Sequence, residues 1–168
     1  MNRFYYLSLQ LILLGTPFLS WAQEDPFRDA VNAYINQKQS SKEKTSAMIL
    51  ALDKKVTSAP VEANNEIDAL LPYAKKLKDR KMEVNLMRVK AASHFYQGKF
   101  QMTEQIGKEA LSLAERYGLQ ADMPKIFATI GSAEIYQSKL IEALETQNKG
   151  LKIAEKLDDK GEIGRAHV

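Results

Sequence analysis

Hydrophobic residues along the second half of the chain follow helical spacing, and their pattern repeats after forty residues. Val84, Met87, Ala91 and Phe95, for example, fall on one stripe of a helix. When the sequence is shifted by forty positions, residues of matching character coincide: Tyr96 with Tyr136, Leu111 with Leu151, Ala114 with Ala154 and Glu115 with Glu155. A period of this length predicts a chain of stacked helix hairpins.

Polar residues and prolines mark the helix boundaries of the first half. Asp25 and Pro26 are suited to the N-cap and first position of one helix, which the polar run 37–41 should end. Ser41 can then cap a helix that carries Met48 to Val56.

The next helix is expected to start at the sequence Ser58-Ala59-Pro60, which supplies a cap and a first-turn proline. Its apolar residues extend to Leu77. Because Pro72 lacks an N–H group and crowds the preceding turn, we expect it to kink this helix or to split it at Leu71.

Glycines and turn sequences divide the second half. Gly98 and Gly118 are placed to end helices 83–97 and 100–117, since glycine readily adopts the left-handed conformation of a helix stop. Pro124 should start the following helix and Leu140 its return helix. Asp158 to Gly161 reads as a turn, so that 162–168 would open a further hairpin and leave the last repeat incomplete. The chain could then be part of a longer protein.

The hairpins resemble tetratricopeptide repeats, in which small and large residues recur at fixed places. The positions that carry the resemblance are Ile130-Gly131, Ser138, Leu140, Ala143 and Gly150-Leu151 in the last complete unit, and Ala91, Gly98, Phe100 and Ala110-Leu111 before it. The sequence departs from the family at Lys90, Thr103, Gly107 and Gln147, and its period is forty residues where the family's is usually 34.

This resemblance implies an all-α, right-handed superhelical stack of helix hairpins over residues 42–168, preceded by a helix and connector at 23–41. It also implies a concave surface formed by the first helix of each hairpin. Aligned to the family's pattern, the residues expected on that surface are Asn85, Arg88, Tyr96, Lys125, Ser132 and Tyr136. For Tyr96 and Tyr136 a second interpretation stays open, in which the rings only pack between neighbouring hairpins.

The first 22 residues have the layout of a secretory signal peptide. Arg3 precedes an apolar run from Phe4 to Leu14, and Ser20-Trp21-Ala22 offers small residues before a cleavage site at Gln23. The run is shorter than the roughly 20 apolar residues of a membrane span, which favours cleavage over retention as an anchor. We therefore expect an exported protein, periplasmic or extracytoplasmic, with no membrane insertion of the mature segment.

Charge and composition narrow the classes of partner. The chain has 24 basic and 21 acidic residues, and removal of Arg3 with the signal leaves 23 against 21. The basic run 75–81 lies at a helix end, where cations oppose the helix dipole, so we interpret it as a solvated helix end and expect no nucleic-acid partner. The sequence contains no cysteine, which excludes disulfides.

No catalytic, cofactor or metal motif is recognisable. The two histidines, His94 and His167, lie far apart in sequence, and no glycine-rich phosphate loop or nucleophile elbow is present. We expect no enzyme and no cofactor, but a scaffold that presents its concave surface to a peptide or protein. The alternative is the extracytoplasmic sensor region of a longer membrane-bound regulator with a kinase or DNA-binding output.

Overall fold

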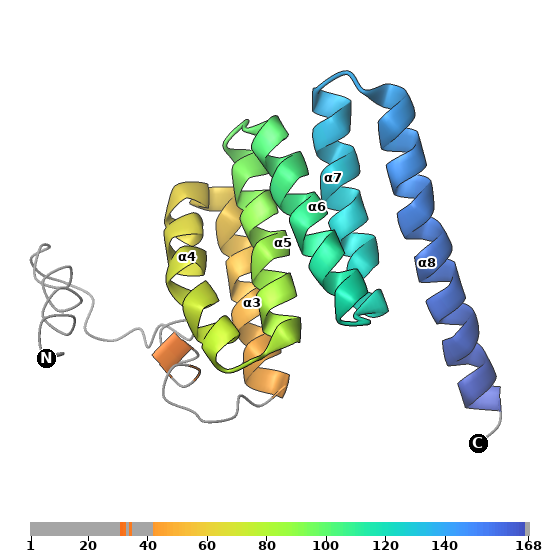
Figure 1. The fold of residues 1–168 in the computed structure, drawn as a ribbon, viewed down its shortest axis with the longest axis horizontal. Helices are drawn as coiled ribbons and strands as arrows, with labels where there is room; N and C mark the ends of the chain where they lie inside the picture. Colours follow the sequence, from red (N-terminus) through yellow and green to blue (C-terminus); the bar gives the residue numbers. More distant parts are fainter. Residues whose placement is uncertain (1–30, 33, 35–41, 167–168) are drawn as a thin grey trace, which may run out of the picture.

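Helices account for all the regular structure in the described part of the chain. The computed structural model describes residues 31, 32, 34 and 42–166 (Figure 1). The helices are α3 (Lys42–Ser58), α4 (Pro60–Lys76), α5 (Arg80–Tyr96), α6 (Phe100–Arg116), the short 3-10 helix η1 (Gln120–Asp122), α7 (Met123–Tyr136) and α8 (Leu140–Ala166). The all-α class expected from the sequence is confirmed.

A left-handed residue occurs every twenty positions and sets the length of the helices. Lys78, Gly98, Gly118 and Ser138 have φ values of 55°, 72°, 67° and 61°. Each follows a helix in the same way. After α5, for instance, Lys99 N–H donates to the His94 carbonyl and Gly98 N–H to the Phe95 carbonyl, the two bonds of a Schellman motif. The chain therefore reverses at each of these turns, and consecutive helices run antiparallel.

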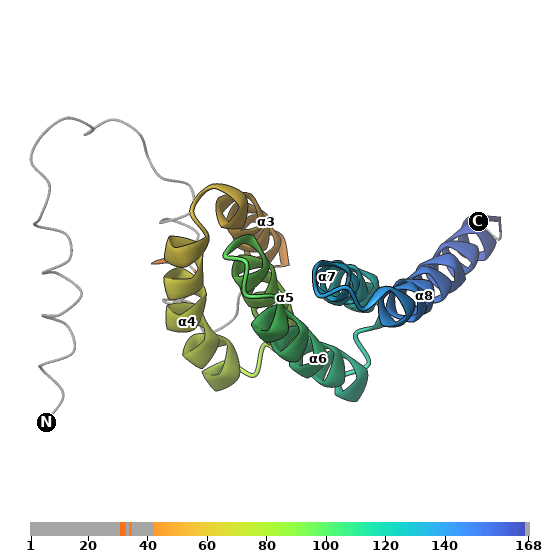
Figure 2. The same ribbon diagram turned by 90° about the horizontal axis from the view of Figure 1, so that it is seen from above.

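α5 lies at the centre of the helix packing. It contacts its neighbours in sequence, α4 and α6, and also α3 and α7, which lie on either side of it (Figure 2). One buried apolar cluster joins α3, α4 and α5 around Leu52, Ile67 and Leu86. A second joins α5, α6 and α7 around Val84, Ala110 and Ile126. The two clusters meet at α5, so helix packing continues along the described chain.

Close helix approach depends on small residues, as the sequence predicts for Gly131. A Cβ atom built on Gly131 would lie 2.7 Å from Cγ of Gln147, on α8. A Cβ on Gly107 would lie 2.5 Å from Cγ1 of Ile130, and one on Gly150 would lie 2.8 Å from Cβ of Phe127. These distances are shorter than ordinary van der Waals contact. The small residues therefore set how closely α6 and α8 approach α7.

Two expected boundaries differ in the structure around α4. The helix is not split at Leu71 but continues past Pro72 to Lys76. Pro60 does open α4, but its N-cap is Ala59, with no side-chain hydrogen bond. Ser58 instead ends α3, and its hydroxyl bonds back to the Lys55 carbonyl at 3.4 Å. The capping role expected from Ser58 is therefore wrong, because Ser58 is the last residue of α3 and Ala59 occupies the N-cap position of α4.

The turn expected at Asp158 to Gly161 is also absent, because α8 continues through it to Ala166. This segment includes Gly161, and a glycine inside a helix costs about 1 kcal/mol relative to alanine. The good helix formers around it, Lys156, Lys160 and Glu162, can offset that cost. The expectation of a new helix starting at Glu162 is therefore wrong.

The predicted signal peptide, residues 1–22, lies outside the described residues, as does nearly all of the connector 23–41. The exceptions are residues 31, 32 and 34, of which Tyr34 is buried in the apolar cluster of α3, α4 and α5. Within the described part of the chain, none of the helices combines the length and the apolar character needed to cross a bilayer.

Candidate functional site

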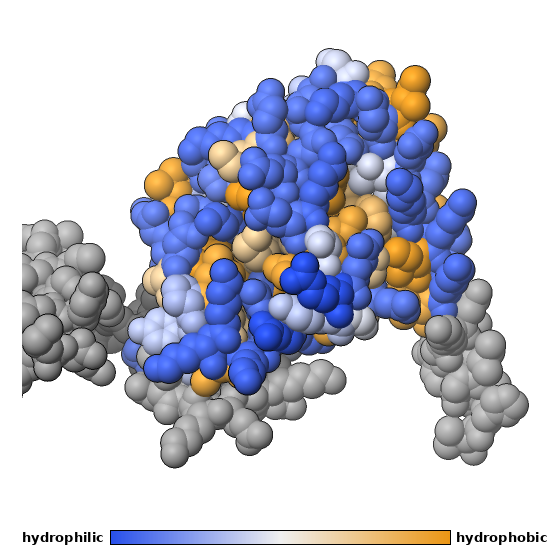
Figure 3. Space-filling view, viewed as in Figure 1, coloured by the Kyte–Doolittle hydropathy of each residue, from blue (hydrophilic) through white to orange (hydrophobic). Residues whose placement is uncertain are grey.

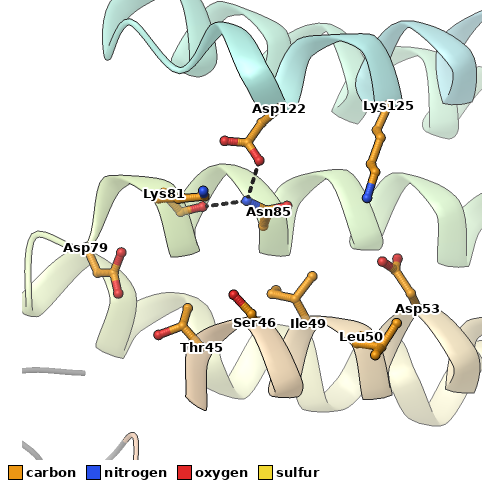
Figure 4. Close-up of a pocket in the computed structure, with 10 residues that line it drawn as sticks. All are labelled: Thr45, Ser46, Ile49, Leu50, Asp53, Asp79, Lys81, Asn85, Asp122 and Lys125. Atoms are coloured by element: carbon orange, nitrogen blue, oxygen red, sulfur yellow. Dashed lines mark hydrogen bonds between the residues drawn. The ribbon is translucent and has the colours of Figure 1, made fainter. Parts of the chain in front are cut away.

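A groove runs across α3, α5 and the start of α7, with a volume of about 470 Å³ (Figure 4). Three helices that are separate in sequence supply its walls because α5 packs between the other two. The lining residues are Thr45, Ser46, Ile49, Leu50 and Asp53 from α3, Asp79, Lys81 and Asn85 from the start of α5, and Asp122 and Lys125 from η1 and α7.

The lining follows the forty-residue repeat. Thr45, Asn85 and Lys125 are separated by forty residues each, and all three face the groove from equivalent places on α3, α5 and α7. The groove is therefore a direct consequence of the repeat: each hairpin places the same position of its first helix on one surface.

An ion pair beneath the groove joins α3 to α5. Arg88 is only 6% exposed, and its two terminal nitrogens donate to the two carboxylate oxygens of Asp53 at 2.9 and 2.8 Å. A paired guanidinium and carboxylate of this kind make a strong, directional contact. The side chain of Asp53 is still 31% exposed and lines the groove. Arg88, which lies beneath the groove, therefore neutralises the charge of Asp53.

The other two carboxylates in the lining are also engaged. Asp79 caps α5 by accepting a hydrogen bond from the Met82 N–H at 3.0 Å. Asp122 accepts from the amide of Asn85 at 3.1 Å, and the same amide donates to the Lys81 carbonyl at 3.0 Å. The Asn85–Asp122 bond ties α5 to the start of α7 across the groove (Figure 4).

The cations in the lining are not engaged in this way. Lys81 and Lys125 are exposed, and neither ammonium group has a hydrogen bond or ion pair with the described residues. Leu50 is 56% exposed, and the half-buried Ile49 lies beside it. The groove thus combines an apolar patch with two unpartnered positive charges, while its negative charges are already satisfied.

Comparison with known proteins adds no family. No family model, curated protein or solved structure matches the chain. The site must therefore be interpreted from its own geometry.

The structure separates the residues that the sequence places on one concave surface. Asn85 and Lys125 line the groove. Arg88, expected to project toward a ligand, is instead buried beneath it, because pairing with Asp53 compensates the loss of hydration of its charge. Ser132 is half-buried further along α7 and is not part of the groove lining.

Tyr96 and Tyr136 belong to an aromatic cluster at the C-terminal ends of α5 and α7, whereas the groove lies near the N-terminal ends of these helices. The Tyr136 ring stacks on Phe100, with centroids 4.8 Å apart, and meets Phe95 edge-on at 5.2 Å. Tyr96 meets Phe95 edge-on at 5.6 Å. Tyr96 contacts a ring of its own helix and Tyr136 contacts rings of the preceding hairpin, yet they remain 51% and 65% exposed. Tyr136 thus has ring contacts with Phe95 and Phe100 in the preceding hairpin, while a ligand contact by either tyrosine stays a prediction.

The α3 side of the groove was missed by the sequence reasoning. The residues that carry the resemblance lie between 91 and 151, so it assigns no surface position to α3. The signal that could have found Thr45 is the spacing itself, since Asn85 and Lys125 project back by forty residues to this position.

Nothing in the described residues gathers into a metal site, since no three His, Asp or Glu side chains lie close enough together to hold an ion. His94 is half-buried, and burial, together with the nearby Lys99 and Lys90, lowers its pKa. Its Nδ1 is buried and has no hydrogen-bond partner among the described residues. His94 is therefore a neutral packing residue at neutral pH, away from the groove.

Proposed function

We propose that this chain is an exported scaffold of the tetratricopeptide type, whose groove across α3, α5 and α7 binds an extended segment of a partner protein. The support for a stacked array is the regular turn every twenty residues and the contact of α5 with the first helices of the hairpins before and after it. Export is part of the proposal and rests on the signal-like pattern of residues 1–22.

The observation that carries the proposal is the alignment of Thr45, Asn85 and Lys125 on one groove wall. A ligand lying along these positions would contact three helices in succession. An extended peptide suits such a surface, because its backbone and alternate side chains can use successive polar and apolar contacts.

The chemistry of the groove favours a segment with an acidic group beside an apolar side chain. The carboxylates of the lining are satisfied by Arg88, by Asn85 and by the N-terminus of α5. Lys81 and Lys125 are left to attract negative charge, and the exposed Leu50 with Ile49 offers a surface that an apolar side chain can cover.

Selection from a random peptide library on the mature chain tests the proposal. We expect the selected peptides to contain Asp or Glu next to a large apolar residue, and to lose at least tenfold in affinity for the Lys81→Glu, Lys125→Glu double variant. Lys149→Glu is the matched control, because Lys149 is also exposed and lies on the side of α8 away from the leucines. Peptides that bind the double variant as tightly as the original chain would show that the groove is not the binding site.

A further inference from the structure

The first part of α8, residues 140–151, carries an exposed apolar face. Leu140, Ile141, Leu144 and Leu151 are 65%, 75%, 62% and 56% exposed. At 3.6 residues per turn, the three leucines fall within about 40° of each other around the helix axis. Ala143 and Gly150, roughly 80–120° around the helix axis from the leucines, are buried, and Gly150 lies against Phe127 on α7. Hydrophobic residues are visible over the α7–α8 turn and along α8 in Figure 3.

The equivalent face of α6 is covered by the following hairpin. Forty residues before Leu140 and Leu144 lie Phe100 and Glu104. Phe100 stacks on Tyr136, and Glu104 accepts hydrogen bonds from Gln137 and Lys139 at 3.0 and 2.7 Å. In this repeat, then, the face is an interface between helices. On α8 the middle position is a leucine instead of Glu104, and no described element covers it.

We propose that a second copy of the chain covers this face, with the two α8 helices packed antiparallel about a two-fold axis near Gln147 and Asn148. Leu144 then lies opposite the partner's Leu151, and the same contact recurs on the other side of the axis. The polar pair 147–148 sits at the centre. Each copy buries leucines that are more than half exposed in the single chain.

The charges beside the stripe select the antiparallel arrangement. Glu145 and Lys152 are both exposed and flank the leucines on the same side of α8. In an antiparallel pair, Glu145 lies within about two residues, or roughly 3 Å along the axis, of the partner's Lys152. A parallel pair would place Glu145 beside Glu145 and Lys152 beside Lys152, which is repulsive. This interface is separate from the groove and does not depend on the proposed peptide binding.

Sedimentation velocity of the mature chain over a range of concentrations tests the proposal. We expect a monomer–dimer equilibrium that Leu144→Glu and Leu151→Glu each weaken at least tenfold. Val61→Glu, which changes a similarly exposed apolar residue on α4, is the matched control and should leave the equilibrium unchanged. A monomer at every concentration, or a dimer that Leu144→Glu leaves intact, would overturn the proposal.

Disulfide trapping gives a second measurement that needs no destabilising change. The chain has no cysteine of its own, so a single new one reports only on the pairing. Asn148→Cys, near the two-fold axis, should form a disulfide-linked dimer under mild oxidation. Leu140→Cys should not, because it lies opposite residue 155 of the partner. Efficient trapping by Leu140→Cys, or none by Asn148→Cys, would rule out the antiparallel pair.

Discussion

Arg88 and Asp53 fix α5 to α3 beneath the groove through two parallel hydrogen bonds of 2.9 and 2.8 Å. The pair is asymmetric: the Arg88 side chain is 7% exposed and that of Asp53 is 31% exposed. The arginine therefore depends on its partner for compensation of its charge, while the aspartate retains some water.

This asymmetry predicts that removing the charge of Asp53 and removing the charge of Arg88 lower the free energy of unfolding by different amounts. Asp53→Ala should lower the free energy of unfolding by about 2–3 kcal/mol, because a buried guanidinium is left unpaired. Arg88→Met should cost about 1 kcal/mol or less, since it fills the same space and leaves a carboxylate that water can reach. Urea denaturation of both variants gives the comparison. A larger cost for Arg88→Met would contradict the account of the pair.

The four left-handed turn residues predict where glycine stabilises. Lys78 and Ser138 have a φ near +60° that costs a non-glycine residue about 1–2 kcal/mol. Replacing either residue with glycine removes this cost. Part of the gain in stability is offset because glycine gives the unfolded chain more conformational freedom. Lys78→Gly and Ser138→Gly should therefore each raise the free energy of unfolding by about 0.5–1 kcal/mol.

Gly98→Ala and Gly118→Ala are the reciprocal changes and should each destabilise by about 1 kcal/mol. A Cβ at either position meets nothing within 4 Å, so the cost comes from φ alone. Thermal melts of all four variants check the pattern. Opposite signs in the two pairs support the turn assignment, whereas a stabilising Gly98→Ala would be inconsistent with it.

Glu104 predicts a pH dependence of stability. Hydrogen bonds from Lys108 and Lys139, at 2.6 and 2.7 Å, lower the pKa of its carboxyl from 4.5 to about 2. A carboxyl with a depressed folded-state pKa stabilises the protein above its unfolded pKa, and this contribution is lost as pH falls from about 4.5 toward 2. Glu104→Gln should therefore lower the denaturation midpoint at pH 6 and have a much smaller effect near pH 2.

The control for this experiment is Glu109→Gln, which removes one negative charge from the exposed side of the same helix. Its effect on the midpoint at pH 6 should be small. A difference between Glu104→Gln and the original chain that stays constant from pH 6 to pH 2 would show that the ion pairs contribute nothing.

The ring and the hydroxyl of Tyr34 should contribute differently to the stability of the protein. The residue is 1% exposed, and its hydroxyl has no hydrogen-bond partner among the described residues. Burial raises the pKa of the phenol above its ordinary value. Tyr34→Phe removes an unsatisfied polar group and should be neutral or stabilise by about 1 kcal/mol. Tyr34→Ala should cost about 3–5 kcal/mol through the cavity it leaves.

Absorbance at alkaline pH and urea denaturation check this prediction. Because burial raises its pKa, the phenol of Tyr34 should titrate only when the chain unfolds. A Tyr34→Phe variant that is destabilised by more than 1 kcal/mol would show that the hydroxyl has a partner.

The sequence predicts the helices and the period well because both depend on local signals. The helical stripe of α5 and its stop at Gly98 both follow from the spacing of apolar residues and glycines. Local signals do not predict the left-handed turn at Ser138, because serine rarely adopts this conformation. Only the repeat predicts it, since Ser138 lies forty residues after Gly98.

The site was predicted only in part, because burial and pairing are properties of the packed chain. Arg88 is expected at the surface by its place in the repeat, and nothing local indicates that Asp53, on another helix, binds it. The end of α8 is a similar case: Asp158 to Gly161 has the composition of a turn but remains helical.

Chemical-shift mapping of a selected acidic–apolar peptide onto the ¹⁵N-labelled mature chain tests the groove assignment most directly. The groove account predicts that the largest shifts cluster on residues 45–53 of α3, on Asn85 and on Lys125, and that they disappear in the Lys81→Glu, Lys125→Glu variant. Shifts confined to α8 or to the aromatic cluster around Tyr136, with α3 unaffected, would contradict it.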